Sequence, residues 1–220
     1  MLSVEKRYRY LYKPAVFAAS LAPAVLLALG AFNLLGQSLG PDPVNRLLHA
    51  CGKTALNFIL ITLLVTPVRE LSGLPHLLRL RRMLGLFTLF YAALHFLVYL
   101  VLDQELDLHA VLADILKRPY ITIGFAALLL LIPLGATSTA KMMRRLGRRW
   151  HKLHRLVYAA AILGAWHYYW QTKRDVREPL LYASLLALLL GYRVATRAKW
   201  VRGLASRARA RPPLRASASE

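Results

Sequence analysis

The chain has 220 residues, of which 57% are hydrophobic and only 18% are charged, and its mean hydropathy is +0.43. Soluble domains carry about 25% charged residues, so this composition excludes an ordinary soluble globular protein. The net charge of +20 would suit a nucleic-acid-binding protein, but the basic residues flank apolar segments and form no single patch, which excludes that class.

Long segments that are almost free of charge follow one another along the chain. They are residues 14–35, 47–68, 84–102, 120–138, 156–170 and 180–192. A helix needs about 20 apolar residues to cross a bilayer, and fewer where flanking side chains reach the interface. We therefore predict an all-α integral membrane protein, a bundle of about six transmembrane helices in contact with membrane lipid, with the fifth and sixth helices the shortest.

The distribution of charge predicts the orientation of this bundle. Of the 30 basic residues, 23 fall in four segments, which are residues 1–13, 69–82, 141–155 and 193–220. Most of the acidic residues fall in the intervening loops. Because loops rich in Lys and Arg stay in the cytoplasm, we expect both termini there.

The same distribution predicts the domain boundaries. Residues 1–13 are expected to form a cytoplasmic N-terminus and residues 14–200 the transmembrane domain. Residues 201–220 are basic and rich in Ala, Ser and Pro, which predicts a disordered cytoplasmic tail. Cys51 is the only cysteine, which excludes an internal disulfide or a thiolate cluster, and a packing role is expected for it.

Prolines and polar residues mark the expected ends of the helices. The second span is expected to stop at Thr66-Pro67, because proline disfavours helix in the residue before it. Pro119 is expected to open the fourth span, since proline suits the first turn of a helix. Between these spans, the periplasmic segment 108–115 is expected to be amphipathic. The sequence shows no internal repeat and no inverted-repeat transporter pattern.

Histidine is the residue type that carries a candidate chemistry. His95 lies well inside the third span, where an ionisable side chain is costly and is a functional candidate by default. Neutral imidazole is a common axial ligand of haem iron. The alternative is a histidine that only hydrogen-bonds a neighbouring helix. His76 and His109 lie in expected loops, where a surface role suffices.

Depth in the membrane suggests how the histidines pair. His154 and His167 are 13 residues apart in the fifth span, or roughly 20 Å along a helix, which suggests two redox stations or one station and an entry site. His95 and His167 fall in the same, periplasmic half and are the predicted pair for an outer haem. His49, at the periplasmic start of the second span, could serve that haem, bind quinone or contact lipid headgroups.

The inner, cytoplasmic half offers no second histidine on the third span to partner His154. Arg81 lies 14 residues before His95, about four turns away and on nearly the same face. Either Arg81 or Arg82 could hold a haem propionate or face the other side of the iron. His151, three residues before His154, is a weaker candidate ligand.

Several ordered motifs together carry a family resemblance. They are Asp42-Pro-Val with His49-x-x-Gly52, Thr62-Leu-Leu-Val-Thr-Pro67, Arg81-Arg-Met-Leu-Gly-Leu with Leu94-His95, Lys117-Arg-Pro-Tyr-Ile-Thr-x-Gly124, Ala136-Thr-Ser-Thr139, and Trp150-x-x-Leu153-His154 with His167-Tyr168. Over residues 40–170 the chain resembles the MsrQ (YedZ) family, the haem-binding membrane subunit of the periplasmic methionine sulfoxide reductase system. That family belongs to the ferric reductase-like transmembrane group.

The resemblance implies a multi-pass protein of the bacterial inner membrane that binds one or two b-type haems through His95, His154 and His167. It implies a non-catalytic electron-transfer subunit of an oxidoreductase complex. The donor would be the quinone pool or a flavin reductase, and the acceptor the periplasmic molybdopterin subunit MsrP, which repairs oxidised periplasmic proteins. Some members are associated with FMN, so a flavoprotein role is a further implied property. Arg81 and Arg82 stand where two-haem relatives have a second histidine.

Two other classes of function stay open at this stage. A small polytopic transporter or channel could use the histidines as a proton relay, although no Asp or Glu lies in the middle of a predicted span. A non-redox membrane anchor for a peripheral partner is the other class, and it would leave His95 without a role.

Overall fold

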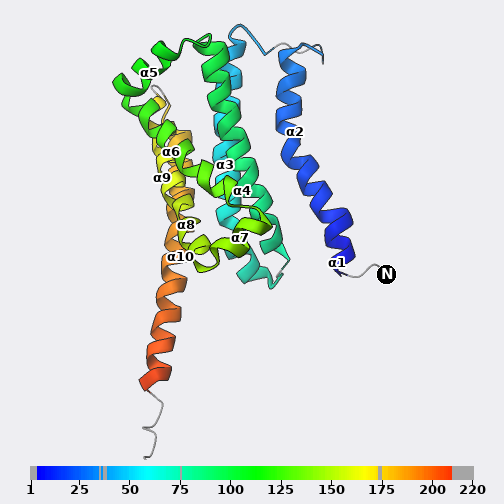
Figure 1. Ribbon diagram of the computed structural model, residues 1–220, viewed down its shortest axis with the longest axis vertical. Helices are drawn as coiled ribbons and strands as arrows, with labels where there is room; N and C mark the ends of the chain where they lie inside the picture. Colours follow the sequence, from blue (N-terminus) through cyan, green and yellow to red (C-terminus); the bar gives the residue numbers. More distant parts are fainter. Residues whose placement is uncertain (1–3, 35, 37–38, 75, 173–174, 210–220) are drawn as a thin grey trace, which may run out of the picture.

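The computed structural model describes residues 4–34, 36, 39–74, 76–172 and 175–209, and the regular elements in these ranges are all helical (Figure 1). In chain order they are α1 (Val4–Arg7), the π-helical turn η1 (Tyr8–Tyr12), α2 (Lys13–Ala31), α3 (Pro43–Ser72), α4 (Leu77–Val98), the π-helical turn η2 (Tyr99–Asp103), α5 (Leu108–Lys117), α6 (Pro119–Ala136), α7 (Ala140–Leu146), α8 (Arg148–Leu153), α9 (Leu156–Gln171) and α10 (Arg177–Arg209).

The predicted all-α membrane bundle is confirmed. Within the described residues, five helical segments are long and apolar enough to cross a membrane: Tyr8–Ala31, Pro43–Ser72, Leu77–Asp103, Pro119–Ala136 and Arg177–Ala198. The sixth expected span, α9, has only 16 residues and is shorter than these. Its small buried residues Ala160, Ala161 and Ala165 instead pack it closely against the interior of the bundle.

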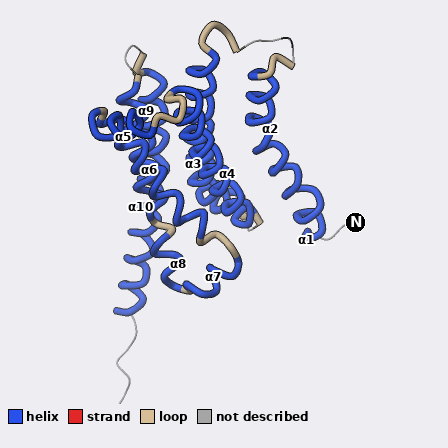
Figure 2. Tube along the Cα trace, turned by 45° about the horizontal axis from the view of Figure 1, so that its top comes forward, coloured by secondary structure: helices blue, strands red, loops and turns tan. Residues whose placement is uncertain are grey.

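The helices are arranged as two antiparallel pairs with a covering helix. α3 packs against α4, α6 packs against α9, and α10 lies along α3 and α9 (Figures 1 and 2). One core cluster is centred on Leu63, which joins α3 to α6, α9 and α10, and a second is centred on Tyr91 of α4. α1 and the end of α10 lie at the same end of the bundle (Figure 1).

α2 lies at the edge of the bundle, and Tyr91 of α4 forms hydrogen bonds with it. The hydroxyl of Tyr91 donates to the carbonyl oxygen of Ser20 (2.7 Å) and accepts from the backbone N–H of Ala24 (3.1 Å). In an uninterrupted helix these two backbone groups would bond to each other. The phenol of α4 therefore inserts into α2 next to Pro23 and joins the two helices.

The predicted stop at Thr66-Pro67 is wrong, because α3 continues through Pro67 to Ser72 and ends at Gly73, whose φ is +68°. A proline inside a helix removes the N–H that would bond to the carbonyl four residues earlier, here that of Leu63. The guanidinium of Arg193 on α10 donates to this carbonyl (Nη2 to oxygen, 2.9 Å). A side chain from another helix thus replaces the missing hydrogen bond.

Other predicted boundaries agree with the structure. α6 begins at Pro119, and α5 begins after Asp107, whose carboxylate accepts from two backbone N–H groups of the first turn. α5 is amphipathic as expected, with Val111 buried and an exposed apolar stripe of Leu108, Leu112 and Leu116. α10 continues through residues 201–209, which were expected to be disordered, and the rest of the expected tail lies outside the described residues.

Candidate functional site

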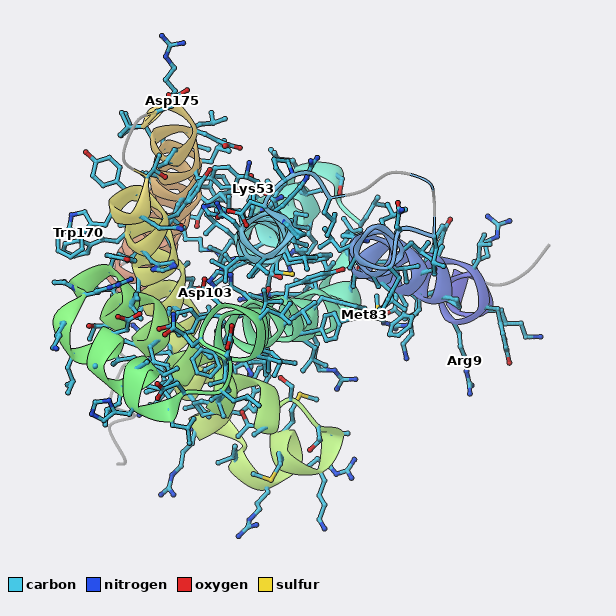
Figure 3. The ribbon with its side chains drawn as sticks, turned by 90° about the horizontal axis from the view of Figure 1, so that it is seen from above. Arg9, Lys53, Met83, Asp103, Trp170 and Asp175 are labelled. Carbon is cyan, nitrogen blue, oxygen red and sulfur yellow. The ribbon has the colours of Figure 1, made fainter. Side chains whose placement is uncertain are left out.

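The structure brings His95 of α4 and His167 of α9 together inside the bundle. Their ring centroids are 6.1 Å apart, and the ring planes are inclined by 74°. Seen from above (Figure 3), Lys53 of α3 and Asp103 at the end of η2 lie towards the middle of the bundle, while Trp170 of α9 points outward. The two histidines predicted to share an outer site are thus neighbours.

A backbone carbonyl fixes the orientation of each ring. Nδ1 of His95 lies 2.8 Å from the carbonyl oxygen of Leu48 on α3, and Nδ1 of His167 lies 2.7 Å from that of Tyr120 on α6. A carbonyl oxygen only accepts, so Nδ1 carries the proton in both rings. In neutral rings, both Nε2 atoms then keep a free lone pair, which is the arrangement of metal-binding histidines.

A glycine provides the space for each ring. A Cβ atom added to Gly52 would lie 3.0 Å from Nδ1 of His95, and one added to Gly124 would lie 2.7 Å from Nδ1 of His167. Each glycine lies one turn after the carbonyl that holds the same ring. In both cases 47 residues separate the histidine from its carbonyl partner. The α3–α4 and α6–α9 pairs therefore present their histidines in equivalent ways, although the sequence shows no internal repeat.

The spacing of the rings suits a metal ion bound between them. A bond from imidazole nitrogen to a metal is about 2 Å long, and each ring centre lies roughly 1 Å beyond its nitrogen. Two imidazoles that bind one ion from opposite sides therefore place their ring centres about 6 Å apart. The observed separation is 6.1 Å. The separation of the two rings therefore fits a haem iron, which His95 and His167 would hold.

His154 lies in a different part of the bundle, at the junction between α8 and α9. Its Nδ1 is 3.2 Å from the carbonyl oxygen of Trp150, its Nε2 is 3.4 Å from the hydroxyl of Ser138, and its ring stacks on Trp150 with centroids 3.8 Å apart. Burial lowers the pKa of His154 below its ordinary value of 6.5, which favours the neutral imidazole. The helix is interrupted at this junction, so His154 and His167 do not share one straight helix.

Of the other inner candidates, Arg81 and His151 lie near His154. Arg81 is half-buried and lies within electrostatic range of His154 and Tyr158. Arg82 is exposed. His151 is exposed too, and its ring meets only the edge of the Trp150 ring, with centroids 5.1 Å apart. His151 therefore lies at the exposed edge of the inner group, and Arg82 does not join it.

His49 lies near the outer pair but is exposed. Its Nδ1 is 2.8 Å from the carbonyl oxygen of Asn45, and its Nε2 is 3.1 Å from the side-chain nitrogen of Gln171 on α9. One turn further along α3, Lys53 pairs with Glu178 of α10 at 2.6 Å. His49 thus belongs to a group of polar side chains that joins α3 to α9 and α10 near the His95–His167 pair.

Sequence reasoning missed several residues of the two sites. Gly52 and Gly124 belong to the motifs that carry the family resemblance, but no role was predicted for them. The reason is that their proximity to the histidine rings arises only when the helices pack together. Ser138 likewise reaches His154 only through the fold. Arg193 was counted only among the basic residues of the last segment, where a charge at the end of a span signals orientation and not a contact.

The bundle and its facing imidazoles define a polytopic membrane protein with a two-histidine interior site. Residues 50–165 match the family described as ferric reductase like transmembrane component. The protein-methionine-sulfoxide reductase heme-binding subunit MsrQ of Xanthomonas campestris pv. campestris (strain B100) is 49% identical over 202 residues, which are 90% of each chain. MsrQ of Bordetella pertussis (strain Tohama I) is 48% identical over 89% of this chain and 93% of that protein.

This chain belongs to the MsrQ family, within the ferric reductase-like transmembrane proteins. The resemblance predicted from the ordered motifs is confirmed, and it extends over nine-tenths of the chain. No solved structure is similar enough to match.

Proposed function

We propose that this protein is a haem b-containing electron-transfer subunit of the bacterial inner membrane. It passes electrons from the quinone pool, or from a flavin reductase, to the periplasmic methionine sulfoxide reductase subunit MsrP. The observation that carries the proposal is the His95–His167 pair at 6.1 Å, with both Nδ1 atoms engaged by carbonyls. The relatives are named as heme-binding subunits, which supports haem as the cofactor.

At the outer site, His95 and His167 would hold the haem iron, which supplies reversible one-electron chemistry when bound. The protein's residues orient and shield this site. The Leu48 and Tyr120 carbonyls keep both rings in one tautomer, which makes Nε2 the ligand atom. Gly52 and Gly124 let α3 and α6 approach the rings closely.

At the inner site, His154 would be the ligand and Arg81 the nearby cation. Ser138 and Trp150 fix the His154 ring on two sides, and burial favours its neutral form. His154 precedes α9 and His167 lies near its end, so the two sites lie at different depths. Electrons would enter in the cytoplasmic half, near His154, and leave in the periplasmic half, near His49 and Lys53. The orientation follows from the basic loops.

Electron transfer between purified partners tests the proposal. The detergent-purified protein is expected to be coloured and to show a b-type spectrum after reduction. A quinol, or a flavin reductase with its nicotinamide, should reduce it under anaerobic conditions. Adding MsrP with methionine sulfoxide should then reoxidise the haem. Without sulfoxide, reoxidation should stop once MsrP has accepted the electrons that it can hold. A reducible spectrum that no MsrP preparation reoxidises would contradict the assigned acceptor.

A further inference from the structure

Arg193 of α10 projects into the bundle and is held by three neutral groups. Its guanidinium donates to the hydroxyl of Tyr158 on α9 (2.7 Å), and to the carbonyl oxygen of Leu63 (2.9 Å) and the hydroxyl of Thr66 (3.1 Å) on α3. The same guanidinium lies 5.3 Å from the centre of the Tyr158 ring. All three of these partners are uncharged.

A second cation lies beside it. Arg81 of α4 interacts with the same Tyr158 hydroxyl and is repelled by Arg193. In the part of the chain that the structure describes, neither arginine forms an ion pair; the pairs found there are Lys53–Glu178, Arg69–Glu70 and Arg118–Asp114. Nε of Arg193 is buried and has no hydrogen-bond partner. Two guanidiniums beside one phenol, with an unused donor, place positive charge where an anion would be stabilised.

We propose that Arg193, together with Arg81 and Tyr158, binds a propionate carboxylate of a haem held by His154. This inference rests on the proposed function and extends it to α10. Tyr158 lies in the first turn of α9, four residues after His154, and Arg81 lies within electrostatic range of both. A propionate at the rim of the ring would therefore meet the two arginines. The planar guanidinium suits a carboxylate because it donates two parallel hydrogen bonds.

The contact of Arg193 with Leu63 also has a structural value, because it satisfies the carbonyl that Pro67 leaves free. A role confined to that contact would affect the stability of the whole bundle and both haem sites alike. Anion binding by Arg193 would instead affect one site. Its positive charge would stabilise the reduced, less positive form of the nearby haem, so its removal lowers the potential of that haem alone.

The test compares Arg193→Gln, Arg193→Lys and the control Arg197→Gln, which changes an exposed arginine one turn further along α10. The haem-to-protein ratio of each purified full-length protein is measured, and its haem is titrated potentiometrically. The component of the redox titration that is lost in His154→Ala is assigned to the inner haem. We expect Arg193→Gln to lower the midpoint potential of that component or to remove it, while the outer component stays unchanged. Arg193→Lys should retain most of the inner component, and Arg197→Gln should equal the wild type.

Three outcomes overturn the inference. In the first, the inner component of Arg193→Gln is unchanged. In the second, both components fall equally, which assigns Arg193 a structural role. In the third, Arg193→Gln loses a co-purified anionic phospholipid while the inner haem is unchanged, which makes a lipid phosphate the occupant. A wild-type protein without haem contradicts the proposed function itself, whereas a wild-type protein with only the outer haem contradicts this inference alone.

Discussion

His95 and His167 come from two different helix pairs and face each other with their ring centroids 6.1 Å apart. Each ring bonds through Nδ1 to a carbonyl of the partner helix in its own pair, α3 for His95 and α6 for His167. The site is therefore assembled by the packing of four helices. Substitution of either histidine should disturb the site. Substitutions on the neighbouring helices that shift a ring should disturb it too.

Gly124→Ala is predicted to perturb the outer haem strongly, because the added Cβ would lie 2.7 Å from Nδ1 and 2.9 Å from Cε1 of His167. Overpacking of this kind costs about 1–3 kcal/mol when the neighbour cannot move freely. Gly52→Ala should have a smaller effect, since its nearest approach to His95 is 3.0 Å. The haem-to-protein ratio and the reduced spectrum of each purified variant measure this order.

Gly164→Ala is the matched control for these variants. Gly164 lies on α9, but a Cβ there would meet only Leu56, at an ordinary contact distance of 3.8 Å. Its haem content should equal that of the wild type. Equal haem loss in all three alanine variants would show that helix packing in general, and not the space for the two rings, determines haem binding.

His154→Ala is predicted to remove less haem than either outer substitution and to leave the outer signal in place. The reason is that His154 has its own surroundings, with Trp150 and Ser138 as neighbours and no contact with the outer pair. His151→Ala, three residues away and exposed, serves as the control and should retain full haem content. A greater loss in His154→Ala than in His95→Ala would reverse the ranking of the two sites.

Tyr91→Phe is predicted to destabilise the protein while leaving its haem content unchanged. The substitution removes the hydroxyl that bridges Ser20 and Ala24 in α2, and leaving such buried groups unpaired costs about 1–3 kcal/mol. Thermal unfolding in detergent measures the loss. Tyr10→Phe changes an exposed tyrosine, 68% accessible, and should leave the unfolding temperature as it is.

The orientation of the bundle is testable with single cysteines in a Cys51→Ala background. The two positions are Glu105, in the loop after η2, and Ser72, at the opposite end of the bundle where α3 terminates. Each is replaced by cysteine. In intact spheroplasts a membrane-impermeant maleimide should label Glu105→Cys and not Ser72→Cys, because both chain termini are predicted to be cytoplasmic. The reverse labelling pattern would place the basic loops outside and refute the orientation.

Much of the fold follows from local sequence signals. Uninterrupted apolar segments predicted the helices, and Pro119 marked the start of α6 where it was expected. Pro67 misled the prediction, because the hydrogen bond that keeps α3 continuous comes from Arg193, which lies far away in the sequence. The interruption at His154 was also missed, since α8 and α9 separate at residues with no strong breaking signal.

The candidate site was predictable only in part, for a similar physical reason. An imidazole in an apolar segment is visible in the sequence, so His95 and His167 could be chosen and paired by depth. Their supports are a carbonyl and a glycine on another helix, and a backbone carbonyl has no sequence signature. Arg193 resembles any basic residue at the end of a span until the fold places it beside Tyr158 and Arg81.

The most direct test of the account is the dithionite-reduced spectrum, with haem-to-protein ratio, of His95→Ala and His167→Ala proteins purified from cells well supplied with haem. Both variants are predicted to lose most of the outer b-type absorbance, while His109→Ala, which changes an exposed histidine on α5, retains all of it. Full absorbance in both variants, or a colourless wild-type protein that still supports MsrP, would contradict the account.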